Sequence, residues 1–294
     1  MSSPAETPAT RTAFIGVGQM GGAMADHLVD RPGGLVVCDR SDAAASALVD
    51  KGALRAATPA EAASDADVVS IMVLDDAQVR DVVAGPDGVL STARPGTVVA
   101  VHSTISDTTA VELAGVALEQ GVHLIDAPVS GGFMGAHAGN LATMVGGTDE
   151  AVALARPSLA AWAELIVHLG PVGAGTRAKI ARNLLHFISF TAAGEAQRLA
   201  EVAGVDLRKL AKVVRHTDAI TGGAGSIMLR DTTAPMTPDD DWWVTLTHVR
   251  RLGEKDLDLA LELAAELGVE LPLGRVARER FGPGLGFADG EGAA

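Results

Sequence analysis

The sequence lacks tyrosine, holds one cysteine among its 294 residues and has only 3% aromatic residues. The missing tyrosine excludes enzymes whose proton donor is a Tyr hydroxyl assisted by a Lys. A single cysteine, Cys38, cannot make an internal disulfide or a thiolate metal site, and the histidines show no His-x-x-x-His or Cys/His cluster. These absences argue against a zinc enzyme, predict no bound metal and fit the reducing cytoplasm.

Basic residues are scarce as well, with 23 Lys and Arg against 37 Asp and Glu and a net charge of −14. Such a charge repels phosphate backbones and anionic lipid surfaces. No uncharged apolar run reaches the roughly 18 residues that would span a bilayer, and residues 1–11 lack the apolar stretch of a signal peptide. We therefore expect a cytoplasmic protein with no nucleic-acid or membrane partner, and a disordered tail over 1–11.

Short β-branched runs alternate with Ala-rich stretches up to about residue 147, at 13–17, 35–38, 68–73, 97–101 and 122–126. This alternation is typical of a doubly wound, mostly parallel sheet. Thr58 and Pro59 mark one helix start, with Glu61 able to close a capping box. Long helical patterns follow at 175–204, 206–216 and 246–268. We predict an α/β domain over 12–172, an all-α domain over 173–285 and a flexible tail over 286–294.

A glycine-rich loop joins the first predicted strand to a helical pattern. Its Gly-x-Gly-x-x-Gly residues are Gly16, Val17, Gly18, Gln19, Met20 and Gly21. In the Rossmann fold the first glycine permits the tight turn, the second lets a pyrophosphate approach the backbone, and the third allows close helix packing. The helix N-terminus then faces the phosphates. The first domain is therefore predicted to be a dinucleotide-binding Rossmann domain.

Asp39 follows the second predicted strand, twenty-one residues after Gly18, where a carboxylate can hold the adenosine ribose hydroxyls. This spacing favours NAD. Arg40 leaves NADP possible, because a guanidinium beside that ribose could bind a 2′-phosphate or stack on the adenine.

Five further motifs, in order along the chain, resemble the β-hydroxyacid dehydrogenase family, the group of 3-hydroxyisobutyrate dehydrogenase and tartronate semialdehyde reductase. They are Asp126-Ala127-Pro128-Val129-Ser130-Gly131-Gly132, Gly135-Ala136, Met144-Val145-Gly146-Gly147, the 175–183 segment with Lys179 and Asn183, and Lys255-Asp256-Leu257. The resemblance implies the two-domain fold above, a nicotinamide cofactor and a homodimer or homotetramer formed through the helical half.

Lys179 and Asn183 are four residues apart in a helical pattern, so they share one face. An ammonium there can donate its proton to a carbonyl oxygen, and a neutral amine can accept one from an alcohol. Because a free lysine has a pKa near about 10.4, useful base chemistry requires burial or nearby cations that lower it. Asn183 suits orienting the reacting oxygen.

The remaining predicted contacts come from loops. The Ser130 hydroxyl and the backbone N–H groups of Gly131 and Gly132 form a compact receptor for a carboxylate. Leu74 and Thr104 follow strands at the carboxyl edge, where doubly wound sheets bind cofactors. The resemblance places both near the nicotinamide and its ribose, and implies that Lys255 closes over cofactor and substrate.

We predict an oxidoreductase that moves a hydride between NAD(P) and a small β-hydroxy acid, or the matching semialdehyde or keto acid, with Lys179 as general acid/base. An imine reductase shares the architecture but usually lacks this lysine, and a decarboxylating sugar-phosphate dehydrogenase needs a longer helical domain. The third alternative is a dinucleotide-binding protein without turnover, and the presence of Lys179 and Asn183 disfavours it. Arg182 stands where the family often has Asn, and His248 where it has an aromatic residue, so the substrate can differ.

Overall fold

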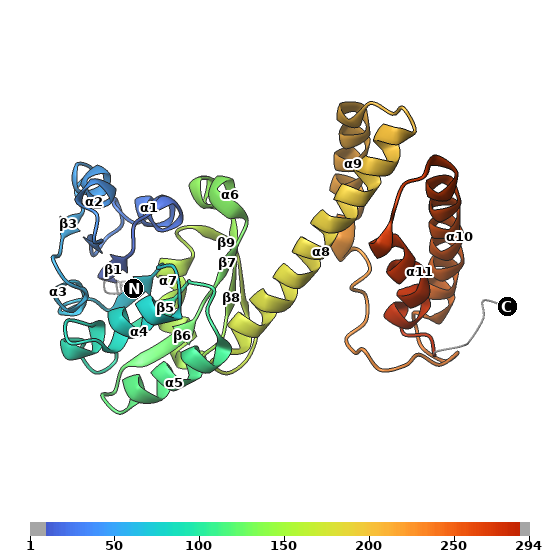
Figure 1. The fold of residues 1–294 in the computed structure, drawn as a ribbon. Helices are drawn as coiled ribbons and strands as arrows, with labels where there is room; N and C mark the ends of the chain where they lie inside the picture. The colour runs from blue at the N-terminus through green and yellow to red at the C-terminus, as the bar shows by residue number, and fades with distance from the viewer. Residues whose placement is uncertain (1–9, 289–294) are drawn as a thin grey trace, which may run out of the picture. The chain divides into compact units, whose positions relative to one another are not determined.

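A six-stranded parallel sheet forms the centre of the first part of the chain in the computed structural model, which describes residues 10–288 (Figure 1). The strands are β1 (Thr12–Ile15), β2 (Leu35–Cys38), β3 (Leu54–Arg55), β4 (Val68–Ile71), β5 (Val98–Val101) and β6 (His123–Asp126). Their order, β3-β2-β1-β4-β5-β6, is that of the Rossmann fold. The chain reverses its direction of winding between β1 and β4, and such sheets bind ligands at this position.

Helices connect these strands and cover the sheet. They are α1 (Gln19–Asp26), α2 (Asp42–Val49), α3 (Pro59–Ala63), α4 (Asp76–Ala84) and α5 (Asp107–Leu118), with a short 3-10 turn, η1 (Val89–Ser91). The predicted start of α3 is confirmed, because Thr58 Oγ1 accepts from the Glu61 N–H at 3.1 Å. The Glu61 carboxylate accepts from the Ala57 N–H at 2.7 Å, one residue earlier than a capping box requires.

A smaller sheet, with strand order β7-β8-β9, follows and was not predicted. Its strands are β7 (Val129–Ser130), β8 (Leu141–Val145) and β9 (Ala163–His168), accompanied by α6 (Gly132–Ala138) and α7 (Asp149–Leu159). Strand β7 pairs antiparallel to β8, and β9 pairs parallel to it. The hydrophobic core between this layer and the six-stranded sheet includes Trp162 and Phe14, whose ring centroids lie 5.8 Å apart.

The rest of the described chain is helical, as predicted. It contains α8 (Ala174–Val202), α9 (Leu207–Thr221), the short turn η2 (Gly223–Gly225), α10 (Trp243–Leu267) and α11 (Pro272–Leu285). Helix α11 was not among the predicted helices. Its N-terminus is held by Glu195 of α8, whose carboxylate accepts from the Leu273 and Gly274 N–H groups at 2.8 and 2.9 Å.

The chain divides into two compact units, 1–182 and 183–294. The predicted tails, 1–11 and 286–294, lie largely outside the described residues. Within the second range, however, Phe287 is buried beside Met236, Leu246 and Leu285, and the Arg250 guanidinium lies 4.8 Å from its ring centroid.

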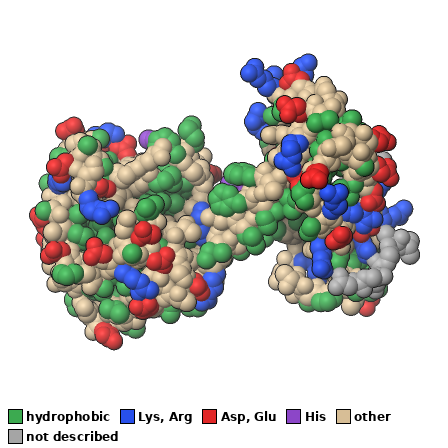
Figure 2. Space-filling model, in the orientation of Figure 1, with side chains coloured by type: hydrophobic (Ala, Val, Ile, Leu, Met, Phe, Trp, Pro, Cys, Tyr) green, Lys and Arg blue, Asp and Glu red, His purple; other side chains and the backbone are tan. Residues whose placement is uncertain are grey.

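Two surface properties concern what the chain can bind. No helix within 10–288 has the length and apolarity needed to cross a membrane. Helix α8 leaves several large apolar side chains exposed, among them Leu184, Phe187 and Phe190, and hydrophobic side chains line its surface in Figure 2. Helix α9 has no buried residue.

Candidate active site

The glycine loop after β1 has the backbone geometry that a dinucleotide loop requires. Gly16 has φ +84°, and a Cβ there would lie 2.3 Å from the Met72 carbonyl oxygen. A Cβ at Gly21 would lie 1.9 Å from the Gly16 oxygen, so the close approach of α1 to the loop excludes a side chain. At Gly18, by contrast, a Cβ would meet nothing within 4 Å. The backbone at Gly18, the N-cap of α1, therefore adjoins open space into which the helix can direct unpaired N–H groups.

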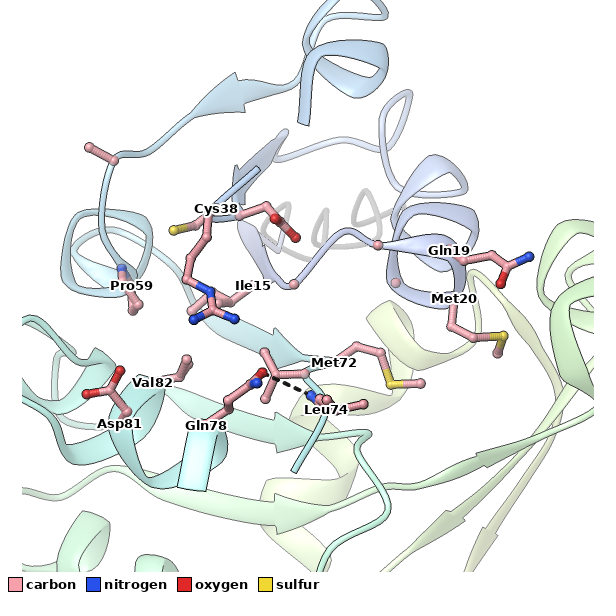
Figure 3. Close-up of a pocket in the computed structure, with 17 residues that line it drawn as sticks. Ile15, Gln19, Met20, Cys38, Pro59, Met72, Leu74, Gln78, Asp81 and Val82 are labelled. Atoms are coloured by element: carbon pink, nitrogen blue, oxygen red, sulfur yellow. Dashed lines mark hydrogen bonds between the residues drawn. The ribbon is translucent and has the colours of Figure 1, made fainter. Parts of the chain in front are cut away.

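This loop forms one wall of a pocket of about 460 Å³ at the carboxyl ends of β1, β2 and β4 (Figure 3). Eight of the ten predicted cofactor residues line the pocket, namely Gly16, Gly18, Gln19, Met20, Gly21, Asp39, Arg40 and Leu74. Thr104 and Lys255 are not among the lining residues. The size of the pocket, its glycine-rich wall and the carboxylate at its edge fit the adenosine and pyrophosphate parts of a dinucleotide.

Asp39 is fixed by two backbone N–H groups. Its Oδ2 accepts from the Val17 N–H and its Oδ1 from the Ser41 N–H, both at 2.8 Å. The first bond ties the end of β2 to the glycine loop. Each carboxylate oxygen has a further lone pair, so the side chain can still accept from ribose hydroxyls.

Two loops at the same edge of the sheet are tied together beside the pocket. The Ser103 hydroxyl, after β5, contacts the N–H and carbonyl of Val73, after β4, at 2.9 and 2.7 Å. Thr104 is exposed and follows Ser103 directly. Leu74 is 81% exposed, and its N–H donates to Gln78 Oε1 at 3.2 Å, the bond drawn in Figure 3.

The other lining residues were not predicted to belong to the site. They are Ile15, Cys38, Ala57, Pro59, Met72, Val73, Gln78, Asp81 and Val82. Met72 and Val73 could have been found, because they end the predicted run at 68–73, at the carboxyl edge of the sheet. The residues from α3 and α4 have no sequence signal, since only the packing of these helices brings them to the pocket.

Lys179 is buried in the first turns of α8, with 9% of its surface exposed. Its ammonium donates to the Val129 carbonyl oxygen at 2.7 Å. Burial lowers the pKa of Lys179 below its ordinary value of 10.5, and the positive charge of Arg182 lowers it further. Lys179 is thus held beside the segment that continues into Ser130.

The Ser130-Gly131-Gly132 segment begins at the last residue of β7 and then turns sharply. Ser130 is half-buried and pairs with Ala142 of β8. Gly131 has φ +131°, a conformation that L side chains rarely adopt, and a Cβ there would lie 2.8 Å from a Leu141 methyl group. A Cβ at Gly132 would meet nothing within 4 Å. The turn therefore requires glycine and leaves its backbone open on one side.

Asp126, at the end of β6, joins this segment to α8. The fully buried carboxylate accepts from the Gly173 N–H at 2.7 Å and from the Thr176 N–H at 2.6 Å, which satisfies donors at the start of α8. Asp126 also exchanges two backbone hydrogen bonds with Gly146, at 3.1 and 2.8 Å. Asp126 belongs to one of the predicted motifs, but no role was predicted for its side chain.

The two other predicted site residues belong to the second unit. Asn183 is half-buried on α8, one turn after Lys179, so the pair shares a helix face as expected. Lys255 is exposed on α10, and its ammonium lies 2.9 Å from an Asp256 carboxylate oxygen. Among the described residues, no group of three His, Cys, Asp or Glu side chains could hold a metal ion.

Two protein-family models match consecutive parts of the chain. The family model of the NAD-binding domain of 6-phosphogluconate dehydrogenase matches residues 11–170. The model described as NAD-binding of NADP-dependent 3-hydroxyisobutyrate dehydrogenase matches residues 173–285. The two matches meet within three residues of the predicted boundary at 172.

Individual relatives cover almost the whole chain. An uncharacterized oxidoreductase of Mycobacterium tuberculosis is 52% identical over 286 residues, 97% of this chain and 96% of its own. The 3-hydroxyisobutyrate dehydrogenase of Pseudomonas aeruginosa is 36% identical over 275 residues, 92% and 91% of the two chains. The crystal structure of an oxidoreductase from Mycobacterium avium, 49% identical, superposes with a TM-score of 0.90 over 94% of this chain and 99% of that one. The chain therefore belongs to the 3-hydroxyisobutyrate dehydrogenase-like family of β-hydroxyacid dehydrogenases, which are NAD(P)-binding oxidoreductases.

Proposed function

We propose that this protein catalyses hydride transfer between NAD(P) and a small β-hydroxy acid, or the matching semialdehyde or keto acid, with Lys179 as general acid/base. The observation that carries the proposal is the placement of the Lys179 ammonium. It is buried, has a lowered pKa and donates to the carbonyl oxygen immediately before Ser130. A buried lysine beside a glycine turn that can bind a carboxylate matches the chemistry of a hydroxy acid.

The proton moves at the Lys179 Nζ atom. When the substrate is an alcohol, the neutral amine accepts the hydroxyl proton; when it is a carbonyl compound, the ammonium donates a proton to the oxygen. The nicotinamide ring, when bound, supplies or accepts the hydride. Because its pKa is lowered, Lys179 is neutral in a larger share of molecules at a given pH than an exposed lysine would be.

The other predicted residues complete the proposed site. Ser130 and the backbone N–H groups of Gly131 and Gly132 bind the substrate carboxylate. Asn183 orients the reacting oxygen from the same face of α8 as Lys179. We propose that Leu74 and Thr104 contact the nicotinamide and its ribose, and that Lys255 contacts cofactor and substrate.

We further propose NAD as the preferred cofactor. Asp39 supports this choice because its carboxylate is fixed at the pocket edge, where it can accept from ribose hydroxyls but would repel a 2′-phosphate. Arg40, which also lines the pocket, is the residue that could accommodate NADP.

The substrate class has support from relatives. The Pseudomonas aeruginosa protein described above is a 3-hydroxyisobutyrate dehydrogenase. An imine reductase is disfavoured by Lys179, because imine reductases of this architecture usually lack a lysine at this position. A binding protein without turnover is disfavoured by the burial of that lysine, which costs free energy that a surface lysine would avoid.

The proposal is tested by measuring the turnover of Lys179→Ala and of the unmodified protein with a panel of β-hydroxy acids and semialdehydes. The absorbance of NADH reports the turnover. Turnover should fall by about a hundredfold to ten-thousandfold, the usual contribution of a general acid/base, while NADH binding, measured by fluorescence titration, should change less than about twofold. Lys51→Ala is the matched control, because Lys51 lies on the surface of the same unit in an ion pair with Asp26, and it should keep full activity. Equal turnover in Lys179→Ala and the unmodified protein would refute the role of Lys179.

We also propose that the chain forms a homodimer or homotetramer through its helical region. The exposed apolar side chains of α8 and the absence of any buried residue in α9 support a further chain covering them. Sedimentation equilibrium at micromolar concentration should give at least twice the mass of 29.9 kDa. A monomer would contradict this proposal.

A further inference from the structure

Arg182 lies on the same face of α8 as Lys179. Residues three and four apart on a helix are neighbours, about 5–6 Å apart at Cβ, so Arg182 and Asn183 flank Lys179 on the following turn. Arg177, two residues before Lys179, projects from the opposite side and donates to the Asp107 carboxylate at 2.7 Å. Arg182 is therefore the arginine of this helix region that shares the face of the proposed catalytic lysine.

The positive charge of Arg182 affects the ionisation of Lys179. It is one of the two causes that lower the pKa of Lys179, after burial. Arg182 is an exposed residue, whereas Lys179 is buried. Its guanidinium therefore adds a second positive charge near Lys179, in a chain whose net charge of −14 disfavours anions at long range.

We propose that Arg182 binds a second anionic group of the substrate, so that this enzyme acts on β-hydroxy acids carrying a carboxylate at each end. The proposal rests on the proposed function, because it takes Lys179 as the position of the reacting oxygen. The first carboxylate binds at Ser130-Gly131-Gly132, and the second meets the guanidinium of Arg182 one helical turn beyond Lys179.

The chemistry of the side chain supports a carboxylate as the second group. A guanidinium offers parallel N–H donors that match both oxygens of a carboxylate, and it stays charged at every pH at which the enzyme works. A phosphate group would satisfy the same donors. The experiment therefore includes a phosphorylated substrate as a separate arm.

The test uses substrate pairs that differ only in one end group. The first pair is 3-hydroxybutyrate and malate, and the second is 3-hydroxyvalerate and 3-hydroxyglutarate; in each, a methyl is replaced by a carboxylate. 3,4-Dihydroxybutyrate 4-phosphate, which carries a phosphate ester at the end opposite the carboxylate, is the third arm. In the unmodified enzyme, kcat/KM should be at least tenfold higher for the dianionic member of at least one pair than for its monoanionic partner. A higher kcat/KM for the phosphorylated compound than for both dicarboxylates would overturn the assignment of a carboxylate as the second group.

Arg182→Gln should remove this preference. The ratio of its kcat/KM for the dianionic substrate to that for the monoanionic partner should fall about tenfold or more, the effect of losing one charge-assisted contact. Any change in the pKa of Lys179 cancels in this ratio, because both substrates use the same lysine. Arg182→Lys should keep part of the preference, and Arg156→Gln, at an exposed position of α7, should keep all of it.

Binding without turnover separates this inference from the proposed function. In the presence of NADH, calorimetry should show glutarate binding at least tenfold more tightly than valerate, and Arg182→Gln should abolish the difference. Equal affinity of the unmodified enzyme for glutarate and valerate would overturn the inference. Equal losses of kcat/KM for both members of a substrate pair in Arg182→Gln would overturn it as well. Absence of turnover with every substrate, combined with intact discrimination in binding, would contradict the role of Lys179 and leave that of Arg182 supported.

Discussion

At the scale of single residues, Lys179 shows how two environmental effects act in one direction. Burial disfavours the ammonium, and the neighbouring Arg182 charge disfavours it too, so both lower the pKa of Lys179. Oxidation of an alcohol needs the neutral amine, while reduction of a carbonyl needs the ammonium. The rate of oxidation should therefore rise with pH through the pKa of Lys179, below 10.5, and the rate of reduction should fall over the same range.

Arg182→Gln removes one of the two effects that lower the pKa of Lys179, so it should shift this pH profile to higher pH. The measurement is kcat/KM for a monoanionic hydroxy acid between pH 6 and pH 10.5, in the variant and the unmodified enzyme. Arg156→Gln should leave the profile unchanged. A profile that stays in place in Arg182→Gln would mean that Lys179 is not the group titrating in the reaction.

His102 is a buried histidine whose burial lowers the stability of the folded protein at acidic pH. It is 1% exposed, Nδ1 contacts the Ala127 carbonyl oxygen at 2.8 Å, and its ring packs against Phe14 and Trp162. Burial lowers its pKa from 6.5 to about 4. Between these two values the unfolded chain binds more protons than the folded one, so stability falls as the pH falls from about 6.5 towards about 4.

His102→Phe should remove this contribution. Between pH 7.5 and pH 5, the unfolding free energy of the unmodified protein should fall by about 2 kcal/mol more than that of the variant. Urea unfolding at the two pH values measures the difference. His216→Phe, at an exposed position of α9, should behave as the unmodified protein does, and parallel losses in His102→Phe would show that His102 titrates normally.

At the scale of elements, the placement of Lys179 depends on how α8 begins. Asp126 accepts hydrogen bonds from Gly173 and Thr176, and Lys179 donates to Val129, three residues after Asp126. The carboxylate thus fixes the start of the helix against the segment that the lysine contacts. In Asp126→Asn, one side-chain acceptor becomes an NH₂ donor that faces a backbone N–H group.

We expect Asp126→Asn to lower the unfolding free energy by about 1–3 kcal/mol, the cost of one unsatisfied buried group. It should also lower kcat for hydroxy-acid oxidation at least tenfold while the Kd for NADH stays within twofold, because the cofactor pocket does not include Asp126. Urea unfolding and steady-state kinetics give both values. Asp87→Asn, at an exposed loop position, is the control. Loss of stability with unchanged kcat would show that the cap does not position the lysine.

The elements also show what sequence patterns can predict. The runs at 35–38, 68–73 and 97–101 contain successive valines, a composition typical of strands in a buried parallel sheet. These runs form fully or largely buried strands in the structure. Strands β3 and β7 have two residues each, and in β9 Glu164, Leu165 and Val167 are exposed, so no buried periodic pattern marks it. Helix α11 contains Gly274, Gly282 and Pro283, which lower its helix propensity. Pro272 at its start and Gly286 after its end were usable signals.

The candidate site was predictable where its residues directly follow predicted strands. The glycine loop, Asp39 and Leu74 line one pocket because they follow three strands that meet at one sheet edge. Gln78 and Asp81 reach the same pocket from α4, and this placement depends on how the helix packs. The contact from Lys179 to Val129 spans fifty residues, so no local pattern could have indicated it.

At the scale of the whole molecule, the tryptophans divide between the two units. Trp162 is buried in the core of the first unit, and the other two, Trp242 and Trp243, belong to the second. Since the chain has no tyrosine, a Trp242→Phe/Trp243→Phe protein fluoresces from Trp162 alone and reports on the unit that holds the dinucleotide pocket.

A ligand that binds only the folded state stabilises it by about 2.7 kcal/mol at one hundred times its Kd. For a unit of the size of residues 1–182, which holds Trp162, that corresponds to a rise in Tm of about 5–10 °C. We expect NAD to raise the Trp162 unfolding midpoint by this amount, and NADP at the same concentration to raise it by less than half as much, because its 2′-phosphate would approach the Asp39 carboxylate. Asp39→Ala should reduce the NAD shift and bring the two cofactors closer together. If NADP gives the larger shift in the unmodified pocket, Arg40 rather than Asp39 determines the cofactor, and the preference for NAD is wrong.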